Sequence, residues 1–378
     1  MRTTTAATSS VACGEAFRQV YWDAQFRDSK GRLIEPPALP VGTRLADTHA
    51  HLDMLHHPQL ALARAAAHDL GLVITVIDPT EDPAYTLDNL GVWQTEAVEL
   101  VTQWEKNGLL SLLRTTKPVL PTVRAIIGCH PHNARRYDQG IEDAILRALT
   151  ADNRVVGIGE IGLDYHYNNS PQDVQQRVFR RQIQLAHEYN MTIALHLREA
   201  HDDGLRILQE EGPPKAGILL HCFNLDFATL RPFLALGCLV AFGGPLTFKK
   251  SEEVRDAARR TPPGRIVTET DAPFMAPHPL RGTVCDPADV AFTAALLAQL
   301  VVEGRTEKHA EGYTEKHGAE EHATEPVLKP VDELNAVPAK EPTVSEGPTA
   351  HTQAVAAPFS PTEALEQFYA NADAFFRS

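Results

Sequence analysis

Histidine, aspartate and glutamate residues recur in six short motifs that are spread over more than two hundred residues of the chain. The motifs are DTHAHLD (47–53), GCHPH (128–132), GEIGLDY (159–165), LHLR (195–198), LHCF (220–223) and ETDAPF (269–274). Nearly every motif ends a short apolar run that is typical of a strand, so imidazoles and carboxylates gather at strand ends. Such groups repel or desolvate one another unless a cation binds between them. The pattern therefore predicts a metal site.

Two of the histidines illustrate the chemistry directly. His49 and His51 are two residues apart, so both point to the same side of a strand. Neutral imidazole is a common ligand of zinc and similar divalent ions. The alternative is an ordinary pair of surface or core histidines, and for His196 or His221 alone it is a hydrogen-bonded core histidine. The companions of these residues at matching strand ends favour metal ligation.

In their order, spacing and residues, the six motifs resemble those of the TatD family of metal-dependent deoxyribonucleases, which belongs to the amidohydrolase-like TIM barrels. The resemblance covers roughly residues 44–302 and resumes at about residues 359–378. It implies a hydrolase that uses two divalent metal ions (Mg, Mn or Zn) to cleave phosphodiester bonds by metal-activated water. The implied substrate is DNA, as strand ends or single strands.

The resemblance also implies roles for individual residues. The implied metal ligands are His49, His51, Glu160, His196, His221 and Asp271. Glu160 would bridge the two ions, and Asp271 would also take a proton from the attacking water, so both are candidate catalytic residues. His132 resembles the family residue that approaches the substrate phosphate, and Arg198 could supply a fixed positive charge for the same phosphate.

Other residues near these motifs have less distinctive roles. Glu269 is expected to support a ligand from behind, and Asp53 to orient the first loop. Lys249, Lys250 and Arg281 are plausible contacts for a nucleic-acid backbone, although a solvated charged loop explains the lysines equally well. After Arg281-Gly282 the family continues with Lys and, two residues further, Asn, whereas this chain has Thr-Val-Cys at 283–285. That departure affects substrate affinity rather than the metal ligands.

Eight apolar runs alternate with amphipathic stretches, which predicts βα units and a parallel sheet. The runs fall near residues 44–47, 72–77, 123–128, 155–159, 192–196, 217–221, 239–243 and 266–270. The clearest amphipathic stretch, at residues 172–189, predicts a helix. Eight such units predict an α/β TIM (β/α)8 barrel of the metal-dependent hydrolase type. An open doubly wound sheet would instead carry a Gly-rich loop where this chain has His-x-His.

The catalytic domain is expected to comprise residues 44–302 plus 359–378, after an N-terminal extension at 1–43. Residues 303–358 hold six prolines and one aromatic residue, with eleven acidic and five basic side chains. Such a composition predicts a low-complexity, disordered insertion, because it cannot bury enough apolar surface to offset the entropy of ordering. Ser360, Pro361 and Glu363 then predict the start of the last barrel helix.

Composition narrows the classes of function. The net charge of −14 argues against a surface that coats nucleic acid generally, although it allows a local phosphate site. We expect a cytoplasmic protein with reduced cysteines, no membrane partner and no obligate protein partner. Two alternatives stay open: hydrolysis of an ester or amide, including an aminoacyl ester on tRNA, and an interaction protein whose functional element is the insertion.

Overall fold

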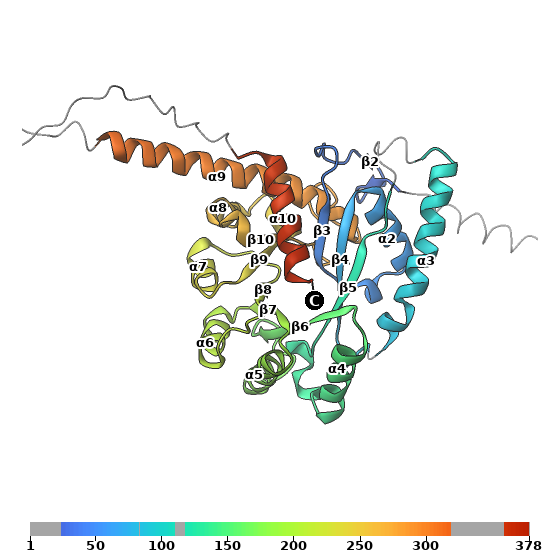
Figure 1. Cartoon of the computed structure of the whole chain (residues 1–378), viewed down its shortest axis with the longest axis vertical. Coiled ribbons are helices and arrows are strands. Elements are labelled where there is room, and N and C mark those ends of the chain that lie inside the picture. Colours follow the sequence, from blue (N-terminus) through green and yellow to red (C-terminus); the bar gives the residue numbers. More distant parts are fainter. Residues whose placement is uncertain (1–23, 83, 110–117, 319–358, 378) are drawn as a thin grey trace, which may run out of the picture.

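The computed structural model describes residues 24–82, 84–109, 118–318 and 359–377, with side chains described for all of these except 307–318. Eight parallel strands follow one another around a barrel in the order β10-β9-β8-β7-β6-β5-β4-β3, and helices lie outside them (Figure 1). The predicted (β/α)8 barrel is confirmed.

The eight barrel strands coincide with the eight apolar runs of the sequence. They are β3 (Leu45–Ala50), β4 (Leu70–Ile77), β5 (Thr122–Ile127), β6 (Val155–Asp164), β7 (Thr192–Arg198), β8 (Ile218–Leu220), β9 (Leu239–Phe242) and β10 (Ile266–Thr268). Every residue of β4 and β6 is buried, because one face of each strand lines the barrel and the other packs under helices. Since β6 continues to Asp164, Glu160 lies inside the strand rather than just after it.

The helices cover the outside of the barrel. They are α2 (Pro58–Ala67), α3 (Tyr85–Lys106), α4 (Gln139–Ala151), α5 (Gln172–Tyr189), α6 (His201–Glu211), α7 (Phe227–Ala235), α8 (Glu252–Arg260), α9 (Val290–Gly318) and α10 (Pro361–Phe375). Short 3-10 helices are η1 (Leu52–Met54), η3 (Pro131–Arg136), η4 (Gly244–Thr247), η5 (Pro263–Arg265) and η6 (Pro287–Asp289). The bounds of α5 are those that its apolar periodicity predicts.

The described part of the N-terminal extension packs against the barrel helices. Strands β1 (Phe26–Arg27) and β2 (Leu33–Ile34) pair antiparallel as a small hairpin. The Phe26 ring is fully buried, with its centroid 4.2 Å from that of His68 at the end of α2 and 4.9 Å from that of Phe292 in α9. From residue 24 onward this segment therefore packs against the barrel helices, a contact that the sequence did not indicate for the N-terminal extension.

Side chains close the barrel between its first and last strands. Thr268 donates from its hydroxyl to the backbone oxygen of Ala46 at 2.6 Å, and the Thr48 hydroxyl donates to the backbone oxygen of Thr268 at 3.0 Å. The buried Asp47 carboxylate accepts from the backbone N–H and the hydroxyl of Thr270, at 2.9 and 2.6 Å. These bonds hold the segment after β10 beside the carboxyl end of β3.

Helix α10 covers the amino-terminal end of the barrel, opposite the end where the strands finish. Ala372 and Phe376 pack among the apolar side chains that fill the barrel interior at its amino-terminal end. Figure 1 shows α10 crossing this end of the barrel. The Asn371 side-chain amide donates to the backbone oxygens of Pro263 and Ile266, at 2.8 and 2.7 Å. The predicted helix start is confirmed, because Ser360 and Glu363 form a reciprocal capping box.

Helix α9 crosses the predicted boundary at residue 303, since its backbone is helical to Gly318. Residues 319–358 of the predicted insertion lie outside the described residues. Within the described chain, residues 287–306 are long and apolar enough to be mistaken for a membrane span. However, 72% of that window is buried inside the protein, where α9 packs against α8 and α10, which is typical of a core helix.

Candidate metal site

The Glu160 carboxylate lies at the centre of a cluster of imidazoles at the carboxyl end of the barrel. It is 4% exposed. Its Oε2 is 3.4 Å from His49 Nε2 and 3.9 Å from His51 Nε2, both on β3 or directly after it. The two histidines therefore point to one side, as their spacing predicts.

The second oxygen of Glu160 faces a different pair of histidines. Its Oε1 is 2.6 Å from Nδ1 of His196, on β7, and 2.8 Å from Nε2 of His221, directly after β8. Nε2 of His130, in the loop after β5, is 3.8 Å from the same oxygen. The two oxygens of Glu160 thus face different pairs of histidines, although the His49 and His221 rings also stack at 3.8 Å and form a further group of possible ligands with Asp271.

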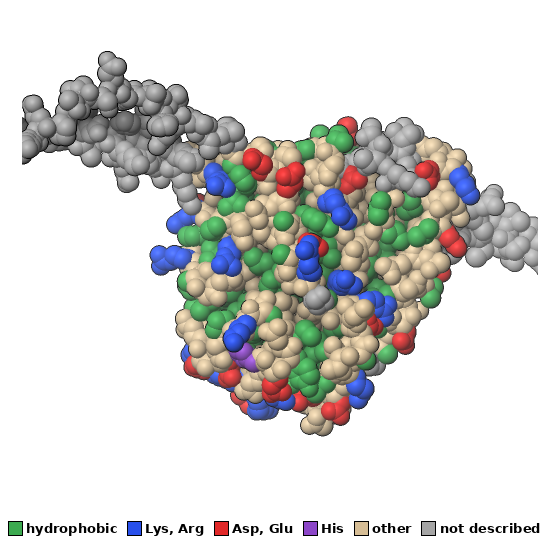
Figure 2. All heavy atoms as spheres, in the orientation of Figure 1, with side chains coloured by type: hydrophobic (Ala, Val, Ile, Leu, Met, Phe, Trp, Pro, Cys, Tyr) green, Lys and Arg blue, Asp and Glu red, His purple; other side chains and the backbone are tan. Residues whose placement is uncertain are grey.

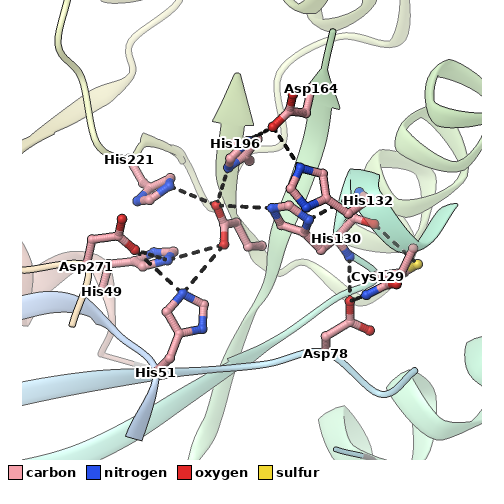
Figure 3. A network of polar contacts seen from close by, with 12 residues as sticks. His49, His51, Asp78, Cys129, His130, His132, Asp164, His196, His221 and Asp271 are labelled. Atoms are coloured by element: carbon pink, nitrogen blue, oxygen red, sulfur yellow. Dashed lines mark hydrogen bonds and ion pairs between the residues drawn. The ribbon is translucent and has the colours of Figure 1, made fainter. Parts of the chain in front are cut away.

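Asp271 joins the first pair from the segment after β10. Its Oδ1 is 3.6 Å from His51 Nε2 and 4.0 Å from His49 Nε2. The backbone N–H of Asp271 donates to the backbone oxygen of His49 at 2.9 Å, so the barrel closure fixes its position. Figure 3 shows His49, His51 and Asp271 to one side of the network, with His130, His132 and Asp164 to the other.

The donor set around His49 fits a cation. This ring is fully buried, and neither of its nitrogens has a hydrogen-bond partner among the described residues. Leaving a buried polar group unpaired costs about 1–3 kcal/mol, so the arrangement is explained when a ligand occupies the space. Ligand atoms that share a cation at about 2.0–2.2 Å stand about 3–4 Å apart, which matches the distances from His49 to Glu160 and Asp271.

The pKa shifts divide the histidines of the site. Burial acts to lower the pKa of His51, His196 and His221, but neighbouring carboxylates, among them Glu160 and Asp271, outweigh it and raise that pKa, so a bound cation would have to displace their protons. Burial lowers the pKa of His49 and places the pKa of His130 well below its ordinary value, so both rings are neutral at pH 7. Burial acts to raise the pKa of Glu160, but the imidazoles led by His221 outweigh it and hold that pKa well below its usual range. Asp271 likewise has a lowered pKa, because its contact with His51 and the other nearby imidazoles outweigh burial. Both carboxylates are therefore anionic.

Two further carboxylates stand behind the ligand candidates. Asp164, also on β6, has its Oδ2 3.1 Å from His196 Nε2. When that nitrogen donates its proton to Asp164, His196 Nδ1 keeps a lone pair on the side of Glu160. Glu269 has its Oε2 3.4 Å from His221 Nδ1, and its Oε1 accepts from the Cys222 backbone N–H at 2.6 Å. Glu269 therefore lies where the sequence analysis expected it, behind a ligand candidate.

The two predicted phosphate contacts lie on the same side of the site. His132 Nε2 is 2.8 Å from Asp164 Oδ2, so Asp164 contacts both His132 and His196. Arg198 lies with its guanidinium carbon 4.7 Å from the centroid of the Tyr167 ring, and that ring meets His132 edge to face at 5.4 Å. The structure brings both residues to the edge of the cluster, and Tyr167 connects them.

Sequence reasoning did not assign roles to His130 and Asp164, although both lie within the motifs. The spacing of both residues in the sequence could have identified them as part of the site. Asp164 is four residues after Glu160 on one strand, so both side chains point to the same side. His130 is two residues before His132, as His49 is before His51. Asp53 lies in η1 and belongs to none of the groups of possible ligands within the described chain.

The chain is similar to known metal-dependent hydrolases and to a nuclease. The sequence model of the family described as TatD related DNase matches residues 46–315. A Bacillus subtilis (strain 168) protein named uncharacterized metal-dependent hydrolase YabD is 34% identical over 260 residues, covering 68% of this chain and 91% of that protein. The human protein named 3'-5' RNA nuclease TATDN2 is 38% identical over 161 residues, covering 42% of this chain and 21% of that protein.

Solved structures show the same architecture. The crystal structure of YJJV, a TATD homolog from Escherichia coli K12, superimposes with a TM-score of 0.59 at 20% sequence identity. The match covers 88% of this chain and 98% of that one. At this identity the likeness supports the barrel fold alone.

Proposed function

This chain belongs to the TatD-related DNase family and is a metal-dependent hydrolase, and from that premise we propose that it hydrolyses phosphodiester bonds in DNA. The proposed substrates are strand ends or single strands, and the proposed cofactors are two divalent ions, Mg, Mn or Zn. The name of the human relative, a 3'-5' RNA nuclease, supports a nucleic-acid substrate in general.

The proposal rests on the Glu160 carboxylate, whose two oxygens face different pairs of histidines. Glu160 Oε2 faces His49 and His51, whereas Oε1 faces His196 and His221. In this proposal the first pair and Asp271 would hold one ion, the second pair would hold the other, and Glu160 would serve both. Two cations held by a shared carboxylate suit in-line displacement at a phosphodiester.

When bound there, divalent ions would supply positive charge near the phosphate and lower the pKa of water so that it can act as a nucleophile at neutral pH. Asp271 is the proposed general base. Its carboxylate is anionic and stands beside His51 at the carboxyl end of the barrel, so it can accept the proton of the attacking water. Glu160 keeps its charge in the same buried site and balances the positive charge there.

His132 and Arg198 are the proposed phosphate contacts, and they are separable from metal binding. Neither is among the proposed ligands, so His132→Ala and Arg198→Ala should leave the metal content unchanged. Each should slow phosphodiester hydrolysis about 10- to 150-fold, because a charge-assisted hydrogen bond contributes about 1.5–3 kcal/mol. Parallel assays on an uncharged ester should show a much smaller loss. Metal lost with either substitution, or equal losses on both substrates, would show that the phosphate contacts are misassigned.

The substrate class is tested with metal-stripped protein to which Mg, Mn and Zn are returned separately. We expect hydrolysis of single-stranded DNA and of strand ends, restored by at least one ion. Duplex DNA without accessible ends, single-stranded RNA and an aminoacyl ester serve as comparison substrates. Faster hydrolysis of the ester than of every nucleic-acid strand would favour the ester-hydrolase alternative and contradict the proposal.

A further inference from the structure

Two exposed aromatic side chains stand on opposite sides of the metal-site cluster. Phe274 is 49% exposed and its ring meets His51 edge to face at 6.1 Å between centroids. Tyr167 is 54% exposed and its ring meets His132 in the same way at 5.4 Å. Figure 3 shows His51 and His132 on opposite sides of the network, so the two aromatic rings contact histidines on different sides of the proposed site.

The backbone around Phe274 is held firmly in place. Its N–H donates to the backbone oxygen of Asp271 at 2.8 Å. The next residue, Met275, packs so closely on η4 that a Cβ at Gly244 would overlap the Met275 backbone oxygen. The ring is therefore presented to solvent by a rigid segment, and its exposure is not a consequence of a loosely packed loop.

Tyr167 is held just as specifically. Its backbone N–H donates to Asp164 Oδ1 at 2.8 Å, so the carboxylate that contacts His132 and His196 also fixes this loop. Arg198 covers the Tyr167 ring with its guanidinium group. The His166 and His132 rings meet that ring at nearly right angles, at 4.8 and 5.4 Å, and more than half of the residue stays exposed to solvent.

Besides Arg198 at Tyr167, basic side chains lie in the loop after η4, the 3-10 helix against which Met275 packs. Lys249 and Lys250 are exposed in the loop after η4, and the Arg281 guanidinium lies 3.9 Å from the centroid of the Phe248 ring in that loop. Among the described residues, none of these three cations nor Arg198 forms an ion pair with a carboxylate. They are therefore available to phosphate groups.

We propose that Phe274 and Tyr167 are base-stacking residues, each of which binds one of the two bases next to the scissile phosphate of a single strand. This inference rests on the proposed nuclease function and deepens it. Aromatic residues bind unpaired bases without regard to sequence, because every base has a π-face, and base-paired nucleotides within a duplex cannot present theirs. The proposal therefore commits the site to unpaired nucleotides on both sides of the cleaved bond.

The test uses DNA strands in which one phosphodiester is cleavable and the others are phosphorothioates. Three further strands lack the base on the 5′ side of that bond, the base on its 3′ side, or both. Loss of one base should lower kcat/KM of the wild-type enzyme about 5- to 150-fold, the range expected for base–aromatic stacking. Phe274→Ala should abolish the penalty on one side only, and Tyr167→Ala on the other side only.

Matched variants separate stacking from damage to the site. Phe274→Trp should retain the penalty, and Tyr189→Ala, an exposed aromatic residue at the far end of α5, should behave as wild type. Each variant's kcat/KM is divided by its own value on the strand that lacks both bases, so that any effect of the substitution on His51, His132 or Arg198 cancels and only the stacking penalty is compared. A wild-type enzyme that cleaves the intact strand without any abasic penalty would overturn the stacking proposal alone. Failure to cleave any strand would overturn the proposed function itself, and penalties that persist in both variants would refute the assignment of these residues.

Discussion

At the scale of single residues, Asp164 has more functional contacts than its place in the sequence suggests. One oxygen of this carboxylate contacts His196 at 3.1 Å and His132 at 2.8 Å, and the other accepts from the Tyr167 backbone at 2.8 Å. Asp164 thereby orients one proposed ligand, one proposed phosphate contact and one proposed stacking residue. Burial acts to raise the pKa of Asp164, but the hydrogen bond with His196 and the other donors outweigh it, so the pKa is lowered and the group stays anionic.

Asp164→Asn therefore tests this positioning role. The amide keeps the shape of the side chain and one acceptor oxygen, but it cannot hold both imidazoles as an anion does. We expect metal affinity or phosphodiester hydrolysis to fall about 10- to 100-fold, as for other residues that orient metal ligands from behind. Metal titrations and kcat/KM would measure the two effects. Wild-type values for both quantities would mean that Asp164 only stabilises the loop.

The ligand candidates themselves could be predicted, because motif order and strand periodicity depend on local sequence. Their partition between the two oxygens of Glu160 could not, since it depends on how β3, β6, β7 and β8 are placed around the barrel. Phe274 illustrates the same limit. Its sequence neighbours place it near Asp271, but only the fold shows it beside His51 and opposite Tyr167.

At the scale of elements, the closure between β3 and β10 links the stability of the barrel to the site. The Asp47 carboxylate accepts three hydrogen bonds, two of them from Thr270 and one, at 3.2 Å, from the His49 backbone N–H. His49 and Asp271 are thus each within two residues of this contact. The sequence predicted all eight strands from their apolar runs, yet the closure could not be predicted because it joins residues more than two hundred positions apart.

Asp47→Ala should weaken this closure. It leaves the backbone and hydroxyl donors of Thr270 buried without an acceptor, so we expect the free energy of unfolding to fall by about 2–4 kcal/mol. Asp47→Asn keeps an acceptor oxygen for the backbone donors and should lose less. Urea unfolding of the two variants beside wild type measures the difference. An Asp47→Ala protein as stable as wild type would show that the closure does not depend on this carboxylate.

At the scale of the whole molecule, the two ends of the barrel have separate roles. Helix α10 fills the amino-terminal end, and the cluster of imidazoles and carboxylates lies at the carboxyl end. Figure 2 shows basic and acidic side chains interspersed over the α10 face, without the one-signed surface that a general nucleic-acid contact would need. The division of the chain into domains and a cytoplasmic location stay predictions.

The segment between α9 and α10 allows a test at this scale. If the barrel alone is the enzyme, a Gly/Ser linker of equal length in place of residues 319–358 should leave hydrolysis unchanged. The melting temperature should shift by no more than about 2 °C, as for surface changes in a domain of this size. Removing 359–378 provides the contrast, because it uncovers the apolar end of the barrel and should cause unfolding. Hydrolysis lost with the linker would instead place the functional element in the replaced segment.

The central claim is that Glu160 bridges two divalent ions, and metal content measured on purified protein tests it most directly. Wild-type protein should bind two ions per chain. Glu160→Gln should bind neither at the same metal concentration and should not hydrolyse DNA, whereas Asp271→Asn should lose hydrolysis while keeping much of the metal. Circular dichroism establishes that both variants fold. A folded Glu160→Gln protein with wild-type metal content and wild-type hydrolysis would contradict the account.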